Sequence, residues 1–360
     1  MRVLILWADD TSENLGVRAL GQGSAALVER AWPGTETAFH SFGHRSPILP
    51  LGRVRSLVRE RVTGARGTKD WFASFDLVLD TRAGDSFADI YGPRRLRMMS
   101  AVAEFATESG TPVVMGPQTI GPFETVQGRA LARFSMRRAR LTMARDSVSA
   151  QYAASIGRPV DLLTTDVAFA LPVPARTTTR DVVLNISGLL WQPGPHVDWE
   201  RYRETITRLH AELTAHGRTV SLLAHVIDSA AKLSDNDVPA IDEFRRLTGT
   251  DDEVIVPTTL GEVREVVASA DVVIGSRMHA CLNALSVGTP AIPLAYSRKF
   301  APLLGDLGWT RTVDLRTDPN PVGAVLALLG SAELVPETER VVARANALLD
   351  EAADLLRSAR

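Results

Sequence analysis

The sequence has little cysteine, little lysine and no long apolar run. Its 360 residues contain one cysteine, Cys281, which excludes a disulfide framework and a thiolate zinc site. No stretch approaches the roughly 18 apolar residues that a membrane-spanning helix requires. The apolar start, Met1–Leu6, is followed by Asp9 and Asp10 before the core of a signal peptide could form. These absences indicate a cytoplasmic protein without a transmembrane segment.

An excess of charge of one sign is also missing. The chain has 40 basic and 42 acidic residues, a net charge of −2, which argues against nonspecific nucleic-acid binding. Only three of the basic residues are lysines. The arginine excess reflects either codon usage in a GC-rich genome or a few arginines that bind a planar anion bidentately, and composition leaves both open. The seven histidines show no zinc-type spacing such as HExxH, so a catalytic metal is not indicated.

The length of the chain and its apolar pattern predict two domains of one class. About 150 residues per domain gives two domains for this length. Short runs that are apolar throughout alternate with longer amphipathic segments, which is typical of parallel strands covered by helices on both faces. We therefore expect an α/β fold with two doubly wound, Rossmann-like domains that face each other across a cleft. The domains are predicted at residues 1–172 and 180–335, with a C-terminal helix at 336–360.

The linker between the two domains is predicted from Leu171–Arg180, LPVPARTTTR, where prolines and threonines separate two periodic regions. The strands expected before and after it are 3–6, 75–80, 112–115, 141–144, 160–163, 182–186, 219–224, 254–256, 271–274, 291–293 and 312–315.

One motif resembles a nucleotide-binding fingerprint. The string Gly21-Gln22-Gly23-Ser24-Ala25-Ala26 fits the GxGxxG pattern of dinucleotide sites. It lies inside the first predicted helix, beyond the strand-to-helix turn where a pyrophosphate needs its glycines. We expect these glycines to serve tight helix packing instead.

Candidate functional residues follow the predicted strands, because ligands of open α/β sheets bind outside the carboxyl ends of the strands. In the first half these residues are Asn14, Asp85, Gln118 and Arg145, and in the second half they are His225, Ser276, Arg277, His279 and Arg298.

The most informative cluster is Ser276-Arg277-Met278-His279, which follows a predicted strand and opens a helix. Backbone N–H groups at a helix start attract anions, and Arg277 adds a planar fork for phosphate or carboxylate. His279 could donate or accept a proton near neutral pH. The alternative is structural: Arg277 pairs with a carboxylate of the neighbouring domain, and His279 caps the helix or packs.

Three further residues have competing interpretations. Arg145 follows a strand and is predicted as a second anion ligand without a structural role of its own, whereas Asp146 is expected to cap the next helix. Asp85 is either a base toward a hydroxyl substrate or a turn residue. Cys281 lies two residues from His279 and so on another helix face, which favours a small buried side chain over a nucleophilic pair.

Several of these segments together resemble the polysaccharide pyruvyl transferase family. The matching segments are Gly275–Leu285 (GSRMHACLNAL), Gly288–Pro293, Tyr296–Phe300, Ala83-Gly84-Asp85, Pro117–Pro122, Arg145-Asp146-Ser147 and Asp166. They span about residues 1–310 in the family's order. Asn14-Leu15-Gly16 matches a family loop in part, since an acidic residue often follows the glycine there and Val17 follows it here.

The resemblance implies a GT-B-like fold and a reaction. The donor would be phosphoenolpyruvate, used as a co-substrate, and a pyruvate ketal would form on two hydroxyls of a sugar or glycan acceptor, free or lipid-linked. This reaction would need no metal and no organic cofactor. By resemblance, Arg145 and Arg277 hold the donor's phosphate and carboxylate and His279 is the general acid. The donor would bind to the C-terminal domain and the acceptor to the N-terminal domain. Ser276, Gln118, His225, Arg298 and Asn14 complete the expected substrate-binding set, and Asp85 is the expected base.

Two other functions remain open from the residues alone. The same fold serves GT-B glycosyltransferases and nucleotide-sugar epimerases, which need a carboxylate for the ribose, and Asp306 or Asp314 would have to supply it. A non-catalytic protein that binds an anionic sugar in the same cleft would bind ligand without releasing phosphate. The sequence leaves the acceptor and the oligomeric state undetermined.

Overall fold

A computed structural model describes residues 1–41, 49, 51–227 and 235–359. Its first sheet is parallel and six-stranded, in the order β2-β1-β3-β4-β5-β6. The strands of this sheet are β1 (Arg2–Leu6), β2 (Glu36–His40), β3 (Leu77–Asp80), β4 (Val113–Met115), β5 (Leu141–Ala144) and β6 (Leu162–Leu163). The strand order reverses between β1 and β3, and in doubly wound sheets the carboxyl edge at such a reversal forms the ligand crevice.

The second sheet is also parallel and six-stranded, in the order β12-β11-β10-β7-β8-β9. Its strands are β7 (Arg180–Asn185), β8 (Val220–Leu223), β9 (Glu253–Ile255), β10 (Ala270–Gly275), β11 (Ala291–Ala295) and β12 (Val313–Asp314). The order reverses between β7 and β10, so the segments that follow these two strands meet at one edge. All the strands expected from the apolar runs are present, with ends that differ by a few residues.

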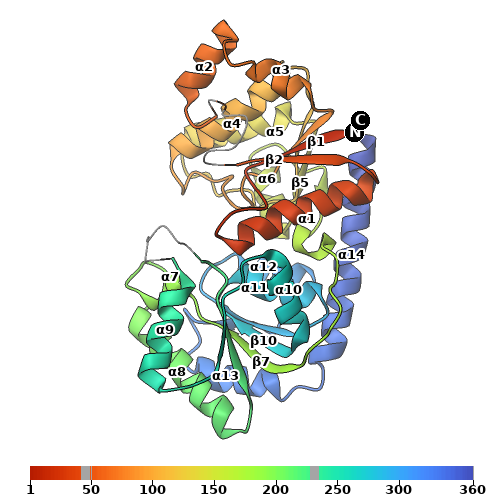
Figure 1. Ribbon diagram of the computed structural model, residues 1–360. Helices are drawn as coiled ribbons and strands as arrows, with labels where there is room; N and C mark the ends of the chain where they lie inside the picture. Colours follow the sequence, from red (N-terminus) through yellow and green to blue (C-terminus); the bar gives the residue numbers. More distant parts are fainter. Residues whose placement is uncertain (42–48, 50, 228–234, 360) are drawn as a thin grey trace. The chain divides into compact units, whose positions relative to one another are not determined.

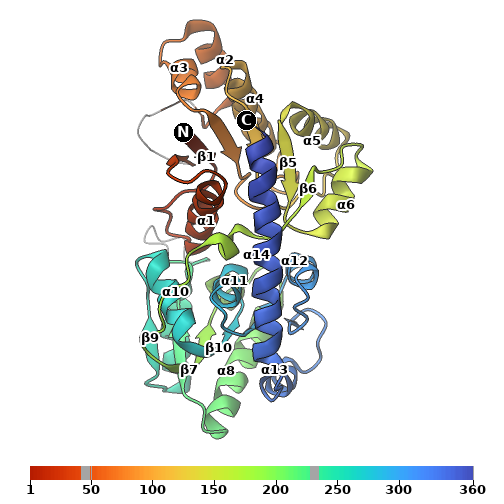
Figure 2. The same ribbon diagram turned by 90° about the vertical axis from the view of Figure 1, so that its right-hand side faces the viewer.

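Helices cover both faces of each sheet (Figures 1 and 2). Those of the first half are α1 (Leu15–Ala31), α2 (Val54–Thr63), α3 (Thr68–Ala73), α4 (Pro93–Glu108), α5 (Val126–Arg138) and α6 (Ser147–Ser155), with a 3-10 turn at Val167–Ala170. Those of the second half are α7 (Gly188–Trp191), α8 (Trp199–Ala215), α9 (Asp237–Thr248), α10 (Leu260–Ser269), α11 (Met278–Ser286), α12 (Phe300–Asp306), α13 (Pro321–Leu329) and α14 (Leu334–Ser358).

The second sheet shows how this layering buries the core. Helices α10, α11 and α12 lie on one face, and α8, α9 and α13 lie on the other (Figure 1). Trp191, Tyr202 and Phe244 pack edge to face beneath β7 and β8 and are all but inaccessible to solvent. Buried aromatic side chains of this size stabilise a layer through area and through edge-to-face geometry. The packing of these aromatic side chains stabilises the sheet at whose edge the Ser276–His279 cluster lies.

The chain divides into two compact units, and the division cuts through two helices. Unit 1 comprises residues 1–10, 20–170 and 345–360, and unit 2 comprises residues 11–19 and 171–344. The expected range 1–172 therefore differs from unit 1 at residues 11–19, which include Asn14 and the first turn of α1. The expected separate C-terminal helix is part of α14, of which residues 345–358 belong to unit 1.

The glycines of the GxGxxG string lie in α1 and serve close packing within unit 1. A Cβ atom added to Gly23 would lie 2.4 Å from the carbonyl oxygen of Val167, and one added to Gly21 would lie 2.7 Å from that of Asp9. Real Cβ atoms do not approach backbone oxygens so closely. The string therefore lets the helix lie against neighbouring backbone, as its position in the sequence predicted.

We predict that Gly23→Ala lowers the free energy of unfolding by about 2 kcal/mol, because a methyl group forced against backbone costs more than the ~1 kcal/mol that alanine gains in a helix. Gly305→Ala in α12 is the matched control, since nothing lies within 4 Å of its added Cβ. Thermal and urea unfolding of both variants measure the effect. Equal stability of the two variants would contradict the packing role.

Candidate functional site

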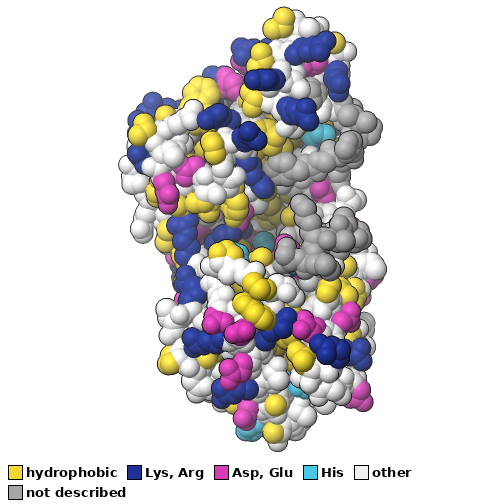
Figure 3. All heavy atoms as spheres, turned by 90° about the vertical axis from the view of Figure 1, so that its left-hand side faces the viewer, with side chains coloured by type: hydrophobic (Ala, Val, Ile, Leu, Met, Phe, Trp, Pro, Cys, Tyr) yellow, Lys and Arg dark blue, Asp and Glu magenta, His cyan; other side chains and the backbone are white. Residues whose placement is uncertain are grey.

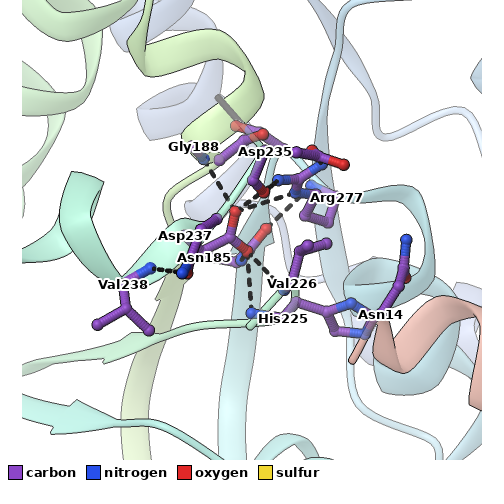
Figure 4. Close-up of polar contacts among 12 residues, drawn as sticks. Asn14, Asn185, Gly188, His225, Val226, Asp235, Asp237, Val238 and Arg277 are labelled. Carbon is purple, nitrogen blue, oxygen red and sulfur yellow. Dashed lines mark hydrogen bonds and ion pairs between the residues drawn. The ribbon is translucent and has the colours of Figure 1, made fainter. Parts of the chain in front are cut away.

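A buried carboxylate joins the strand ends of unit 2. Asp237, the first residue of α9, is fully buried, and its Oδ1 accepts a hydrogen bond from the Gly188 N–H at 2.9 Å. Its Oδ2 accepts from the N–H groups of His225 at 2.9 Å and Val226 at 3.0 Å, and from Asn185 Nδ2 at 3.4 Å. The segments that follow β7 and β8 are thus held by one side chain (Figure 4).

The same carboxylate holds Arg277. Asp237 Oδ1 accepts from Arg277 Nε at 3.1 Å and Nη2 at 2.7 Å, while Asp235 Oδ1 accepts from Nη1 at 2.7 Å. Burial would lower the pKa of the guanidinium, but the two carboxylates outweigh it, and the pKa of Arg277 lies above its ordinary value. Arg277 therefore has the predicted structural role, with partners in its own unit rather than in the neighbouring domain. Asp237 is fully buried, whereas the side chain of Asp235 is 47% exposed.

Ser276 lies behind Arg277 in contact with a tyrosine. The Ser276 hydroxyl is buried, 2.9 Å from the hydroxyl oxygen of Tyr202, and this oxygen accepts from the Ser187 N–H at 2.9 Å. Burial raises the pKa of Tyr202, so it keeps its proton. The Tyr202 and Ser276 hydroxyls share a hydrogen bond in which either can donate.

His279 lies on the first turn of α11, half-buried, against the segment 11–19. A Cβ atom added to Gly16 would lie 3.0 Å from His279 Nδ1, so a methyl group there would crowd the imidazole. Asn14 Oδ1 accepts from the Gly16 N–H at 2.9 Å, and Asn14 pairs with Val226 in an isolated antiparallel bridge. Asn14, expected in the N-terminal domain, therefore lies in unit 2 beside His279.

His225 is buried and uncharged at neutral pH. Burial, together with the charges of His279 and Arg277, lowers its pKa to about 3. Arg264 Nη1 donates to Asn283 Oδ1 at 3.0 Å, which turns the amide nitrogen of Asn283 toward His225 Nε2, 3.5 Å away. His225 Nε2 therefore accepts from the Asn283 amide, and the ring proton of His225 is on Nδ1. His225 and His279 lie in one site, and His225 is the one that burial holds neutral.

The carboxyl edge of the first sheet carries a strained turn after β3. Arg82, Ala83 and Gly84 have φ of 48°, 52° and 77°, the left-handed region in which the two non-glycine residues cost energy. This turn presents Asp85, which is half-buried, and Asp85 Oδ2 accepts from the Tyr91 hydroxyl at 2.8 Å. A carboxylate held at a strained turn fits both expected roles, base and turn residue.

Arg145 has a buried partner in unit 1. It is 2% exposed; its Nη1 donates to Asp166 at 2.7 Å and its Nε donates to Thr119 Oγ1 at 3.1 Å. The expectation that Arg145 has no structural role is therefore wrong, because burial of a guanidinium requires a compensating carboxylate. Asp146 caps α6 as expected, accepting from the Ser149 N–H at 2.8 Å.

Gln118, Arg298 and Cys281 are the remaining predicted positions. The Gln118 side chain is fully buried, and its amide has no hydrogen-bond partner within the described part of the chain. The main-chain carbonyl of Gln118 accepts from the Arg145 backbone N–H at 3.1 Å, which places the two residues together. Arg298 lies exposed on the turn before α12. Cys281 is buried, and burial raises the pKa of its thiol, as expected for a packing residue.

The structure thus brings the candidates into two groups. In unit 2 the group is Asn14, His225, Ser276, Arg277 and His279; in unit 1, Gln118 and Arg145 meet, with Asp85 on the strained turn. The sequence analysis missed Asp235 and Asp237, although an Asn–Asp pair shortly before Pro239 is a helix-start signal. Helix α9 begins at Asp237, so this signal marks the residue that joins the strand ends.

Neither a metal site nor a spanning helix stands out in the described ranges. No group of three or more His, Cys, Asp or Glu side chains within residues 1–41, 49, 51–227 and 235–359 is arranged to hold a metal ion. No helix in this part of the chain has both the length and the apolar character to cross a bilayer.

Comparison with solved structures shows the fold. UDP-GlcNAc 2-epimerase from Methanocaldococcus jannaschii is similar over 99% of both chains, with 11% identity and a TM-score of 0.60. S. aureus MnaA in complex with UDP is similar over 97% of this chain and 94% of its own, with 14% identity and a TM-score of 0.60. The Neisseria meningitidis epimerase bound to UDP-GlcNAc has 11% identity over 100% and 99% of the two chains and a TM-score of 0.56. The predicted GT-B-like fold of two Rossmann-like domains is confirmed.

Comparison of sequences identifies the family. No curated protein matches the chain. The sequence profile of polysaccharide pyruvyl transferases matches residues 32–298, well over half of the chain, and this range includes Asp85, Arg145, Arg277 and His279. The resemblance noted in the motifs is therefore confirmed, and the chain belongs to the polysaccharide pyruvyl transferase family.

Proposed function

We propose that the protein transfers the pyruvyl group of phosphoenolpyruvate to two hydroxyls of a sugar or glycan, forming a ketal and releasing phosphate. The observation that supports this most directly is the meeting of His279 and Arg277 at the start of α11, with His225 held uncharged beside them. A proton donor next to a guanidinium suits a small anionic substrate that must be protonated on carbon.

The donor would compete with Asp235 for Arg277. Asp237 is fully buried and holds the guanidinium from inside, so this contact persists. The half-exposed Asp235 carboxylate accepts a hydrogen bond from Arg277 Nη1, at the outer side of the guanidinium. A phosphate or carboxylate of phosphoenolpyruvate that binds there replaces one anion by another and keeps the charge-assisted hydrogen bond.

His279 is the proposed general acid. It protonates the methylene carbon of phosphoenolpyruvate, C2 becomes cationic, and the first sugar hydroxyl adds to C2 and loses its proton. The bond between C2 and the phosphate oxygen then breaks, phosphate leaves, and the second hydroxyl adds to C2 and loses its proton to close the ketal. The buried His225, with its pKa of about 3, stays neutral and orients a substrate or the neighbouring ring.

The acceptor side of the proposal rests on unit 1. Asp85 is the proposed base toward the sugar hydroxyl, and the Tyr91 hydroxyl bonded to it would orient the carboxylate. The buried amide of Gln118 and the Arg145–Asp166 pair lie at the same sheet edge and are proposed to form its binding surface. Arg145 would act here through its neutral ion pair and not as a free anion ligand.

The central test is phosphate release from phosphoenolpyruvate across a panel of sugars, sugar nucleotides and lipid-linked glycans. We expect phosphate release that depends on an acceptor, and its loss in His279→Ala with phosphoenolpyruvate binding largely kept. His216→Ala, an exposed histidine at the end of α8, is the control and should behave as wild type. Turnover of a nucleotide sugar without any use of phosphoenolpyruvate would overturn the proposal in favour of an epimerase or glycosyltransferase.

Asp235→Asn should bind phosphoenolpyruvate more tightly. Removing a half-exposed competing charge is worth up to about 1 kcal/mol, or roughly a fivefold lower KM for the donor. The matched control is Asp242→Asn, an exposed carboxylate on α9. A KM that rises in Asp235→Asn alone would show that Asp235 supports donor binding instead of competing with it.

The buried neutral His225 predicts an acid-sensitive fold. The pKa of about 3 in the folded chain compares with about 6.5 when unfolded, so the unfolded state binds the extra proton between these values. The free energy of unfolding should therefore fall as the pH drops below 6.5, by up to about 1.4 kcal/mol per pH unit from this group. Urea unfolding between neutral pH and pH 5 should show a steeper loss in wild type and in the exposed control His216→Gln than in His225→Gln. If the free energy of unfolding fell equally with pH in His225→Gln and wild type, His225 would not be the source of the acid sensitivity.

A further inference from the structure

Helix α2 and the turn after it concentrate positive charge. Residues 53–69 carry six basic and one acidic side chain, a net charge of +5 in a chain whose total is −2. The six basic residues, all exposed, are Arg53, Arg55, Arg59, Arg61, Arg66 and Lys69. The single acid, Glu60, is buried, and its carboxylate accepts from the backbone N–H groups of Arg66 and Thr68. The surface of this segment is therefore basic with little local neutralisation.

The same helix exposes an apolar stripe. Val54, Val58 and Val62 are 37%, 57% and 82% exposed. Their spacing of four residues puts them on one face, within an arc of about 80°. Leu57 is buried, and the contacts of α2 with α4 fix the side on which the helix packs. The valines thus lie on a face that the folded chain leaves to solvent.

Arginines border this stripe on both sides. By helical periodicity, Arg55 and Arg59 lie along one edge of the valines and Arg61 along the other. Arg61 also pairs with Glu108 at 2.6 Å, whereas no ion pair of Arg55 or Arg59 is present among the described residues. Apolar and basic side chains gather at the end of unit 1 where α2 lies (Figures 1 and 3).

An open cavity of about 480 Å³ adjoins the basic edge. It is lined chiefly by polar and basic side chains, those of Arg53, Ser56, Arg59, Glu60, Thr63 and Arg66. Three guanidinium groups around one depression suit a phosphate, which guanidinium binds bidentately. By the same periodicity, Ser56, Glu60 and Thr63 line the cavity from the side of α2 turned away from the valines, so the cavity meets the stripe's border only at Arg59.

We propose that α2 docks the protein on an anionic phospholipid surface. The valines enter the boundary between headgroups and acyl chains, and the flanking arginines extend to the phosphates. Charge complementarity selects this occupant, because basic side chains next to a membrane gain from the negative surface of the bilayer. A protein partner of acidic surface or a nucleic acid would use the arginines without needing the valines.

The test is cosedimentation of the intact protein with vesicles that contain phosphatidylglycerol, compared with pure phosphatidylcholine vesicles. We expect binding to the anionic vesicles only, and weaker binding as salt is raised. Arg55→Gln/Arg59→Gln should weaken it by about fivefold per arginine. Val58→Ser/Val62→Ser should weaken it at unchanged charge. Inorganic phosphate at the concentration of the lipid phosphate should leave binding intact, since it lacks the apolar part.

Matched controls come from other exposed helix positions. Arg208→Gln/Arg246→Gln removes the same charge from α8 and α9, and Val126→Ser/Val148→Ser removes two exposed valines from α5 and α6. Both should bind vesicles like wild type. The proposal is overturned by equal binding to both vesicle types, by equal losses in the control pairs, by the serine variants binding fully, or by α2-dependent binding to RNA or an acidic protein alone. Vesicle binding is measured without substrate, so failure of the pyruvyl-transfer proposal leaves this test unaffected.

Discussion

The organisation of unit 2 depends on one buried carboxylate. Asp237 accepts hydrogen bonds from backbone groups after β7 and β8 and from the guanidinium that follows β10. An isolated buried charge is costly, so Arg277 compensates Asp237, and the backbone N–H groups satisfy the remaining lone pairs. The position of Arg277, and of His279 two residues on, therefore follows from a fully buried carboxylate. A lost Asp237 would leave a buried arginine and three strand ends without their common partner.

The need to pair buried charges also changes how the arginines at the strand ends are interpreted. Arg145, Arg277 and Arg82 follow strands and are buried, and each forms an ion pair, with Asp166, Asp237 and Asp80 respectively. Burial raises the pKa of Asp80 in spite of Arg82, which shows how strongly these sites are desolvated. Guanidinium groups at the sheet edges thus serve first as counter-ions of buried carboxylates. Anion binding, where it occurs, must use the outer atoms of these pairs, and at Arg277 those atoms face the half-exposed Asp235.

Much of the fold was predictable because apolar runs and helix signals are local. The strand before Ser276 and the helix that begins after Arg277 follow from residues within one short window, and both are present. The ion pairs were not predictable, because Asp237 is 40 residues from Arg277 along the chain and its contact depends on tertiary packing. Asn14 was placed with the wrong domain for the same reason. No local pattern says on which sheet a loop will pack.

Three glycines near the start of α1, Gly16, Gly21 and Gly23, lie where a neighbouring residue approaches the helix closely. A Cβ atom at Gly16 would crowd His279, whereas Cβ atoms at Gly21 and Gly23 would clash with backbone oxygens of unit 1. In each case the missing Cβ creates room for a neighbour, although Gly21 and Gly23 lie in a string that reads like a nucleotide motif. Residues 11–19 belong to unit 2 and the rest of the helix to unit 1. The first turn of α1 therefore packs against residues of unit 2, and the later turns pack against residues of unit 1. The glycine content of α1 therefore follows from packing, and at Gly16 that packing fixes where the proposed acid lies.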